Sequence, residues 1–119
     1  MNYKYIRKIQ KRIRKCKAEL AKVNDEINNY TQVLSDMPKG GSISNKVEDC
    51  VIRRQDLMKE IENLEIKLRA LIKGIPNTEQ GNAIRMKLKG WSWRRIATDI
   101  EDNPNLWDSI RKRCERYTW

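Results

Sequence analysis

Histidine is absent from this chain of 119 residues, and its absence removes the commonest general base and the commonest metal ligand of proteins. The sequence also shows no paired carboxylates, no nucleophile matched with a base and no glycine-rich phosphate loop. Catalysis and metal binding of the usual kinds are therefore disfavoured. We expect a protein that is not an enzyme and has no catalytic residues, no metal site and no cofactor.

Glycine, proline and cysteine are also scarce, with five, three and three residues respectively. An all-β fold with many turns needs more glycine and proline. Three cysteines without a Cys-x-x-Cys spacing describe neither a disulfide framework nor a zinc site. No apolar run is long enough to cross a bilayer, and no signal peptide is recognisable. These absences predict a cytoplasmic protein with no membrane partner.

Positive charge is abundant, because 26 Lys and Arg face 16 Asp and Glu, which gives a net charge of +10 at pH 7. Residues 1–17 hold eight basic side chains and no acidic one. A polyanion such as nucleic acid is the natural partner of such a chain. We predict that a stripe of four lysines at helical spacing contacts nucleic acid: Lys4, Lys8, Lys11 and Lys15. The alternative is a solvated face that only keeps the protein soluble.

Apolar residues recur at alternating steps of three and four from Ile6 to Leu34, and the pattern resumes from Val47 to Ile75. This alternation is typical of the seam of a coiled coil. The sequence therefore predicts an antiparallel coiled-coil helical hairpin over residues 1–76.

The stretch "SDMPKGGSISNK" separates the two seams. Pro38, Gly40 and Gly41 stop a helix, and small polar residues surround them. We predict a loop over residues 36–45, with Ser44 or Asn45 capping the second helix.

Folding the chain back at this loop closes the two seams on each other. In the predicted register, Leu20 stands opposite Ile61, and Ile6 stands opposite Ile75. The alternative is that one helix pairs with its copy in a second chain, which would make the protein a homodimer.

Residues 77–119 divide into three short helical segments with recognisable start and stop signals. Gly90 is suited to ending the first segment, Ser92 to capping the second and Pro104 to opening the third. We expect the large tryptophan side chains of this segment to fill the core of a very small unit.

Ala97, Trp107 and Ile110 have the spacing of a helix-turn-helix, in which a small residue at the helix crossing precedes apolar anchors. Glu101 and Asp102 depart from the pattern, which usually has a glycine and then an apolar residue. The alternative is three packing helices with no role in DNA binding. The predicted fold class is all-α, with a long antiparallel helical hairpin followed by a C-terminal trihelical helix-turn-helix unit.

The last helix of this unit is the predicted recognition helix. Its exposed residues Asn105, Ser109 and Lys112 are the candidates for contacts with base edges. Asp108 either accepts a hydrogen bond from a cytosine amino group or repels the duplex. The residues predicted to contact phosphates are Arg111, Arg113 and Arg116 on this helix and Arg94 and Arg95 on the helix before it.

The stretches "KVEDCVIRRQDLMKEIENLEIKL" and "MKLKGWSWRRIA" resemble small phage regulators of the RinA and ArpU type. Members of that family combine an N-terminal helical hairpin with a C-terminal domain similar to the promoter-reading end of bacterial sigma factors. The matching positions are Gly90, Ser92, Trp93, Ile96 and Ala97, followed by Trp107, Ile110, Arg113 and Cys114 at the recognition-helix anchors. The resemblance implies a phage or prophage origin, a bacterial host cytoplasm and a role in transcriptional control.

The residues and the resemblance together predict a phage-type transcriptional regulator that binds double-stranded DNA. The alternative is a small phage inhibitor, such as an anti-CRISPR protein or a blocker of host RNA polymerase, that binds a host protein or its nucleoprotein complex. A regulator should bind duplex DNA alone, whereas an inhibitor needs its protein target.

Overall fold

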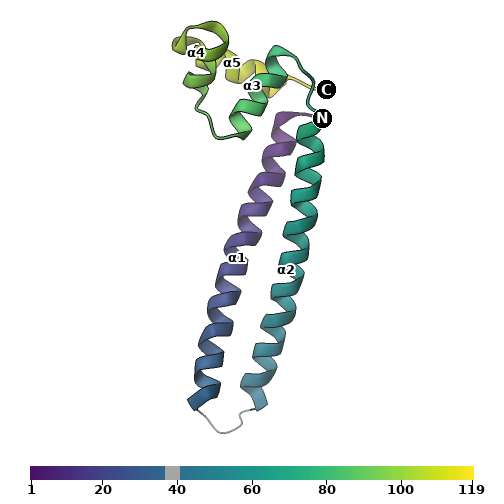
Figure 1. Cartoon of the computed structure of the whole chain (residues 1–119), viewed down its shortest axis with the longest axis vertical. Helices are drawn as coiled ribbons and strands as arrows, with labels where there is room; N and C mark the ends of the chain where they lie inside the picture. The colour runs from purple at the N-terminus through teal and green to yellow at the C-terminus, as the bar shows by residue number, and fades with distance from the viewer. Residues whose placement is uncertain (37–40) are drawn as a thin grey trace. The chain divides into compact units, whose positions relative to one another are not determined.

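The computed structural model describes the backbone of residues 1–36 and 41–119 and the side chains of residues 1–30 and 45–119. The elements in chain order are α1 (Tyr3–Asp36), α2 (Gly41–Lys73), α3 (Glu79–Leu88), α4 (Trp93–Glu101), the 3₁₀ helix η1 (Pro104–Leu106) and α5 (Trp107–Arg116). The long helices α1 and α2 run antiparallel, and three short packed helices follow (Figure 1). The predicted all-α fold is therefore confirmed. No helix in the described part of the chain is long and apolar enough to span a membrane.

Backbone packing divides the chain into two compact units. Unit 1 comprises Met1–Ile9 and Lys67–Trp119, and unit 2 comprises Gln10–Ile66. Each long helix therefore contributes to both units. This division differs from the boundary after residue 76 that the sequence predicted, because the ends of the two long helices pack with the three short ones.

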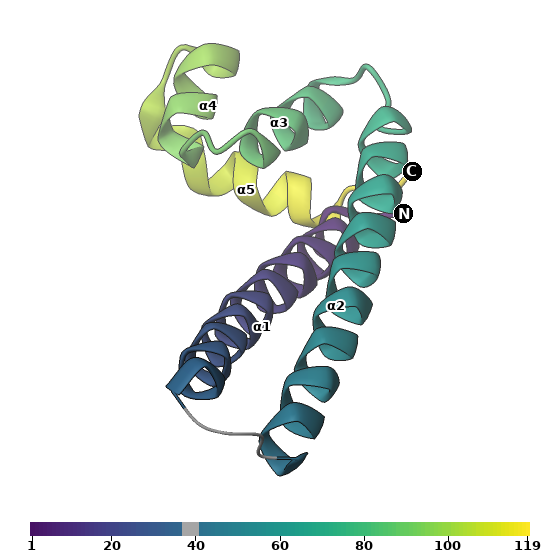
Figure 2. The same ribbon diagram turned by 60° about the horizontal axis from the view of Figure 1, so that its bottom comes forward.

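The core of unit 1 draws on all of its segments. Ile6 of α1 and Ile75, just beyond α2, are buried together with Ile84 of α3 and Ile96 of α4. The helices α3, α4 and α5 lie against one another (Figure 2). Because three such short helices bury too little surface to be stable alone, the ends of the long helices supply apolar side chains that complete the core. The other buried members are Tyr3, Ala83, Ala97, Ile110 and Cys114.

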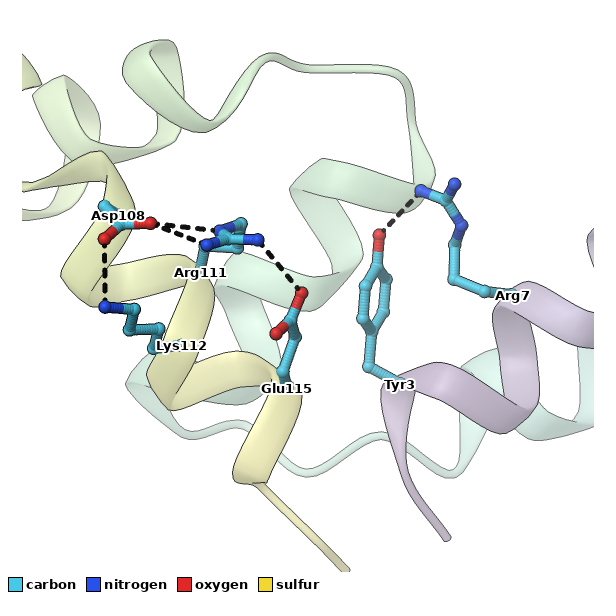
Figure 3. Close-up of polar contacts among 6 residues, drawn as sticks. All are labelled: Tyr3, Arg7, Asp108, Arg111, Lys112 and Glu115. Atoms are coloured by element: carbon cyan, nitrogen blue, oxygen red, sulfur yellow. Dashed lines mark hydrogen bonds and ion pairs between the residues drawn. The ribbon is translucent and has the colours of Figure 1, made fainter.

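The start of α1 is also held in unit 1 by specific contacts. The N-terminal amine of Met1 donates to the carbonyl oxygen of Trp119 at 2.8 Å, and the Trp119 N–H donates back to Met1 at 3.0 Å. The ring of Tyr3 meets Trp93 of α4 edge to face, with centroids 6.0 Å apart. Arg7 donates to the Tyr3 hydroxyl at 3.0 Å (Figure 3). These contacts fix the first helical turn beside the short helices.

Unit 2 consists of the middle parts of α1 and α2. Its buried core is formed by residues of the two predicted seams, which confirms that both seams face inward: Cys16, Val23, Leu57 and Ile61. Further seam residues pack around them: Leu20, Ile27, Cys50 and Leu64. Ion pairs between exposed side chains flank the core: Arg12–Glu60 at 2.7 Å on one side and Lys17–Glu65 at 3.2 Å on the other.

The flanking ion pairs indicate the register between the two helices. If Arg12 stood directly opposite Glu60, Cys16 would stand opposite Asp56. If Lys17 stood directly opposite Glu65, Cys16 would stand opposite Ile66. The seam lies between the flanks, so Cys16 stands opposite Ile61. In the predicted register Leu20 stands opposite Ile61, so the two registers differ by about one helical turn. A seam that repeats every three or four residues keeps its apolar contacts after such a shift, so the periodicity did not determine the register.

The predicted loop over residues 36–45 is too long. Helix α1 continues through Asp36, and α2 begins at Gly41, so Ser44 and Asn45 lie within α2 and do not cap it. Ser and Asn lower helix stability by less than about 1 kcal/mol relative to Ala, and a helix therefore tolerates them. The stronger stop signals fall in residues 37–40, which lie outside the described residues.

The three cysteines provide a separate probe for each unit. Cys16 is buried in unit 2, Cys114 is buried in unit 1 and Cys50 is partly exposed. Burial raises the pKa of the Cys114 thiol to about 11, so its reactive thiolate is scarce near neutral pH. We expect iodoacetamide to alkylate Cys50 first in the native protein, with Cys16 and Cys114 protected. Mass spectrometry of peptides checks this order, and rapid native labelling of Cys114 would contradict the described core.

Candidate nucleic-acid interface

Side-chain caps and one glycine set the ends of α3 and α4. Thr78 caps α3 by accepting from the Gly81 N–H at 3.1 Å. Gly90 follows the end of α3 with φ of 100°, a left-handed conformation that glycine adopts without strain. Ser92 caps α4 by accepting from the Arg95 N–H at 3.2 Å. The predicted roles of Gly90 and Ser92 are therefore confirmed.

The linker before α3 is held tightly against that helix. Gly81 approaches the linker so closely that an added Cβ would overlap the carbonyl oxygen of Pro76. Arg85 donates to Asn77 Oδ1 at 2.6 Å and to the carbonyl oxygen of Ile75. This arginine therefore stabilises the path of the chain and is occupied by protein acceptors.

The helices α4 and α5 meet through the residues that the helix-turn-helix spacing selected. Ala97 and Ile110 are buried in the unit 1 core, with exposed fractions of 0% and 4%. Trp107 is partly buried and packs against the same core. Because Ala97 has a small side chain, it lets the helices approach closely at this point. The predicted packing role of the three residues is confirmed, and a role in DNA binding stays a prediction.

The turn between α4 and α5 does without the usual glycine. Glu101 ends α4, and the next residue, Asp102, adopts the left-handed conformation with φ of 53°. A short polar side chain makes this conformation accessible to Asp at modest strain. Asn103 then accepts from the Asn105 N–H at 3.0 Å, and Pro104 opens η1 as predicted. The departure from the usual pattern at Glu101 and Asp102 therefore leaves a tight turn in place.

An ion-pair network covers part of the outer side of α5 (Figure 3). Asp108 Oδ1 lies 2.7 Å from Arg111 Nη2, and Asp108 Oδ2 lies 3.2 Å from Lys112 Nζ. Glu115 Oε1 lies 3.7 Å from Arg111 on its other side. Hydrogen bonds from Arg111 and Lys112 lower the pKa of Asp108 from its ordinary value. Two predicted nucleic-acid contacts are therefore neutralised within the helix itself.

The α3–α4 junction, unlike the balanced network on α5, has an excess of basic side chains. Residues 80–98 contain five basic side chains and no acid. The Arg95 guanidinium lies over the Trp91 ring with its carbon 3.9 Å from the ring centroid, which is a close cation–π stack. The Lys87 ammonium lies 5.4 Å from the Trp93 ring centroid. The predicted site included Arg95 but missed Lys87 and Trp91, although a basic run interleaved with tryptophan could have revealed them.

The predicted contact residues are accessible but do not form one group. Exposed side chains are those of Lys4, Lys8, Lys11, Lys15, Arg94, Arg95, Asn105, Ser109, Lys112, Arg113 and Arg116, and Arg111 is partly buried. Arg113 also pairs with Glu101 at 3.7 Å. The lysine stripe is split, because Lys4 and Lys8 belong to unit 1 whereas Lys11 and Lys15 belong to unit 2.

Positive charge is concentrated in one of the two units. Unit 1 holds fifteen Lys and Arg and six Asp and Glu, which leaves +9 of the total of +10. Unit 2 holds eleven basic and ten acidic side chains, which leaves +1. The charge pattern of unit 2 is therefore that of an ordinary solvated helix pair, and the excess belongs to the unit with the short helices.

Apart from charge, the described residues offer few features that indicate a function. No group of three or more Cys, Asp and Glu side chains within residues 1–30 and 45–119 is arranged to hold a metal ion. Comparison with known proteins gives no significant match to any family model, any curated protein or any solved structure.

Proposed function

We propose that the chain is a DNA-binding protein that contacts the duplex through unit 1. The observation that carries this proposal is the charge of unit 1, which holds +9 of the chain's net +10. A basic surface confined to one unit is the electrostatic signature of a nucleic-acid-binding domain. If the positive charge served only solubility, it would not need to be concentrated in unit 1.

The α3–α4 junction supplies the contacts with backbone phosphates. Lys89, Arg94 and Arg95 are exposed there, and residues 80–98 contain five basic side chains and no acid, with Asp99 the next residue along α4. The stack on Trp91 orders the Arg95 guanidinium before any ligand arrives. An ordered guanidinium loses less conformational entropy when it binds a phosphate with two parallel hydrogen bonds.

The helix α5 supplies the contacts with base edges. Asn105 and Ser109 are exposed polar residues at the N-terminal side of α5, where recognition helices meet the major groove. Phosphate contacts fix the position of the protein on the duplex, and base contacts select the sequence. The resemblance to phage regulators supports transcriptional control in a bacterial host as the purpose of this binding.

A protein partner is the second candidate, and the network on α5 favours it. Arg111 and Lys112 are paired with Asp108 and so attract phosphates weakly. A helix face with balanced charges suits a polar protein surface as well as a groove of DNA. In this case the chain would act as an inhibitor that binds a host protein or nucleoprotein complex, such as RNA polymerase.

Fluorescence anisotropy with a labelled duplex of random sequence tests the proposal. The purified chain should bind without any other protein, and its affinity should fall steeply between about 50 and 200 mM salt. If five basic residues contact phosphates, the log–log salt slope is about −4.5. Absence of binding at the lowest salt, with the protein folded by tryptophan fluorescence, would favour the protein partner.

A further inference from the structure

The position of Asp108 in α5 suggests a role beyond helix stability. Its carboxylate stands in the first turn of the helix, and both of its oxygens are engaged by cations. Arg111 contributes two donors, Nε at 3.2 Å and Nη2 at 2.7 Å, and Lys112 reaches the second oxygen at 3.2 Å. The carboxylate is 44% exposed, so it meets solvent, or a ligand, on the outer side of α5.

The network removes most of the positive charge from this part of α5. Asp108 and Glu115 together balance Arg111 and Lys112. A phosphate could recruit Arg111 only by displacing a carboxylate that already holds it through two hydrogen bonds. The guanidinium also lies 5.9 Å from the Trp107 ring centroid, which further restrains it. The α3–α4 junction has one acid nearby, Asp99, which lines the same hollow as Trp91 and Arg95, against five basic side chains in residues 80–98. The two surfaces of unit 1 therefore differ in net charge.

Repulsion at one surface beside attraction at another is a way to obtain specificity, because it penalises the wrong partner. A carboxylate repels phosphates wherever α5 lies near the backbone, whatever the sequence. The same carboxylate accepts a hydrogen bond from a cytosine amino group when α5 meets a base edge. Asp108 therefore disfavours binding that relies on phosphates alone and tolerates binding in which α5 reaches the bases.

We propose that Asp108 is a specificity-determining residue for duplex DNA, which restrains Arg111 and Lys112 so that α5 contributes little to sequence-independent binding. This inference rests on the proposed function. An acid in the first turn also stabilises a helix through its dipole, and that purely structural role predicts no change in the salt dependence of DNA binding. The two roles can therefore be separated by experiment.

The test compares Asp108→Asn with Asp25→Asn, a matched change of one charge at an exposed residue of α1 in unit 2. Binding to a pool of random duplexes is measured across a salt series. Because Glu115 still pairs with Arg111, removal of the Asp108 carboxylate frees one net positive charge, which should steepen the log–log slope by about 0.9 and raise the affinity for the pool about fivefold. Sequencing of the selected duplexes should show weaker base preference than for the wild type. Asp25→Asn should keep the wild-type slope and preference.

Each outcome decides the matter. Equal slopes and equal base preference for Asp108→Asn and Asp25→Asn would overturn the role of Asp108 while leaving DNA binding intact. Failure of wild type and both variants to bind any duplex would overturn the proposed function itself. Tryptophan fluorescence verifies folding, and Asp108→Ser gives a second removal of the carboxylate with a residue suited to a first helical turn. Asp108→Glu retains the charge and should restore the wild-type slope.

Discussion

Replacement of Ile6 by alanine is expected to lower the free energy of unfolding of unit 1 by about 2–5 kcal/mol. Ile6 is fully buried, and it lies in the same core as residues of α3, α4 and α5 although it belongs to the start of α1. Truncation would leave a cavity in a unit too small to collapse around it. All four tryptophans lie in unit 1, so denaturant unfolding followed by their fluorescence reports on this unit.

Ile52→Ala is the matched control, because Ile52 lies on α2 in unit 2 and is 57% exposed. It should change stability by no more than about 0.5 kcal/mol. Cysteine alkylation shows which unit is destabilised. In Ile6→Ala, Cys114 of unit 1 should become reactive at a lower denaturant concentration than Cys16 of unit 2. Equal and small effects of the two alanine variants would contradict the inclusion of the start of α1 in unit 1.

Neutralising the α3–α4 junction is expected to weaken duplex binding on the order of a hundredfold near physiological salt. The variant combines Lys89→Gln, Arg94→Gln and Arg95→Gln, three exposed residues of the α3–α4 junction. Loss of three phosphate contacts should flatten the log–log salt slope by about 2.7. Anisotropy titrations with the same random duplex measure both quantities.

The control changes the net charge by the same amount in unit 2. It combines Lys22→Gln, Lys46→Gln and Lys59→Gln, which are exposed and lie within Gln10–Ile66. This variant should bind like the wild type apart from a small general effect of net charge. A similar loss in both triple variants would show that total charge, and not the α3–α4 junction, governs binding.

Local rules predicted the helices and their ends well. The seam residues Cys16 and Ile61 are buried as the periodicity required, and Ser92 caps α4 through the hydrogen bond that its side chain makes possible. Gly90 adopts the left-handed conformation expected of a residue that ends a helix. Such features depend on neighbours in the chain, so a single sequence contains them.

Features that depend on distant residues were not predicted. The register of the hairpin differs by about one turn, because the seam offers similar apolar contacts in neighbouring registers. The place of Ile6 in the core of the short helices was not predicted, because no local signal shows it. The pairing of Asp108 with Arg111 and Lys112 follows helical spacing, so the sequence contains the signal for it.

Backbone amide hydrogen exchange with and without duplex DNA tests the central claim, that unit 1 is the DNA-binding part of the chain. Slower exchange is expected around residues 87–95 and in α5 when a random duplex is added at low salt. The amides of Gln10–Ile66 should exchange at unchanged rates, because that unit carries almost no net charge. Protection confined to unit 2, or none in either unit while the tryptophan fluorescence stays native, would contradict the claim.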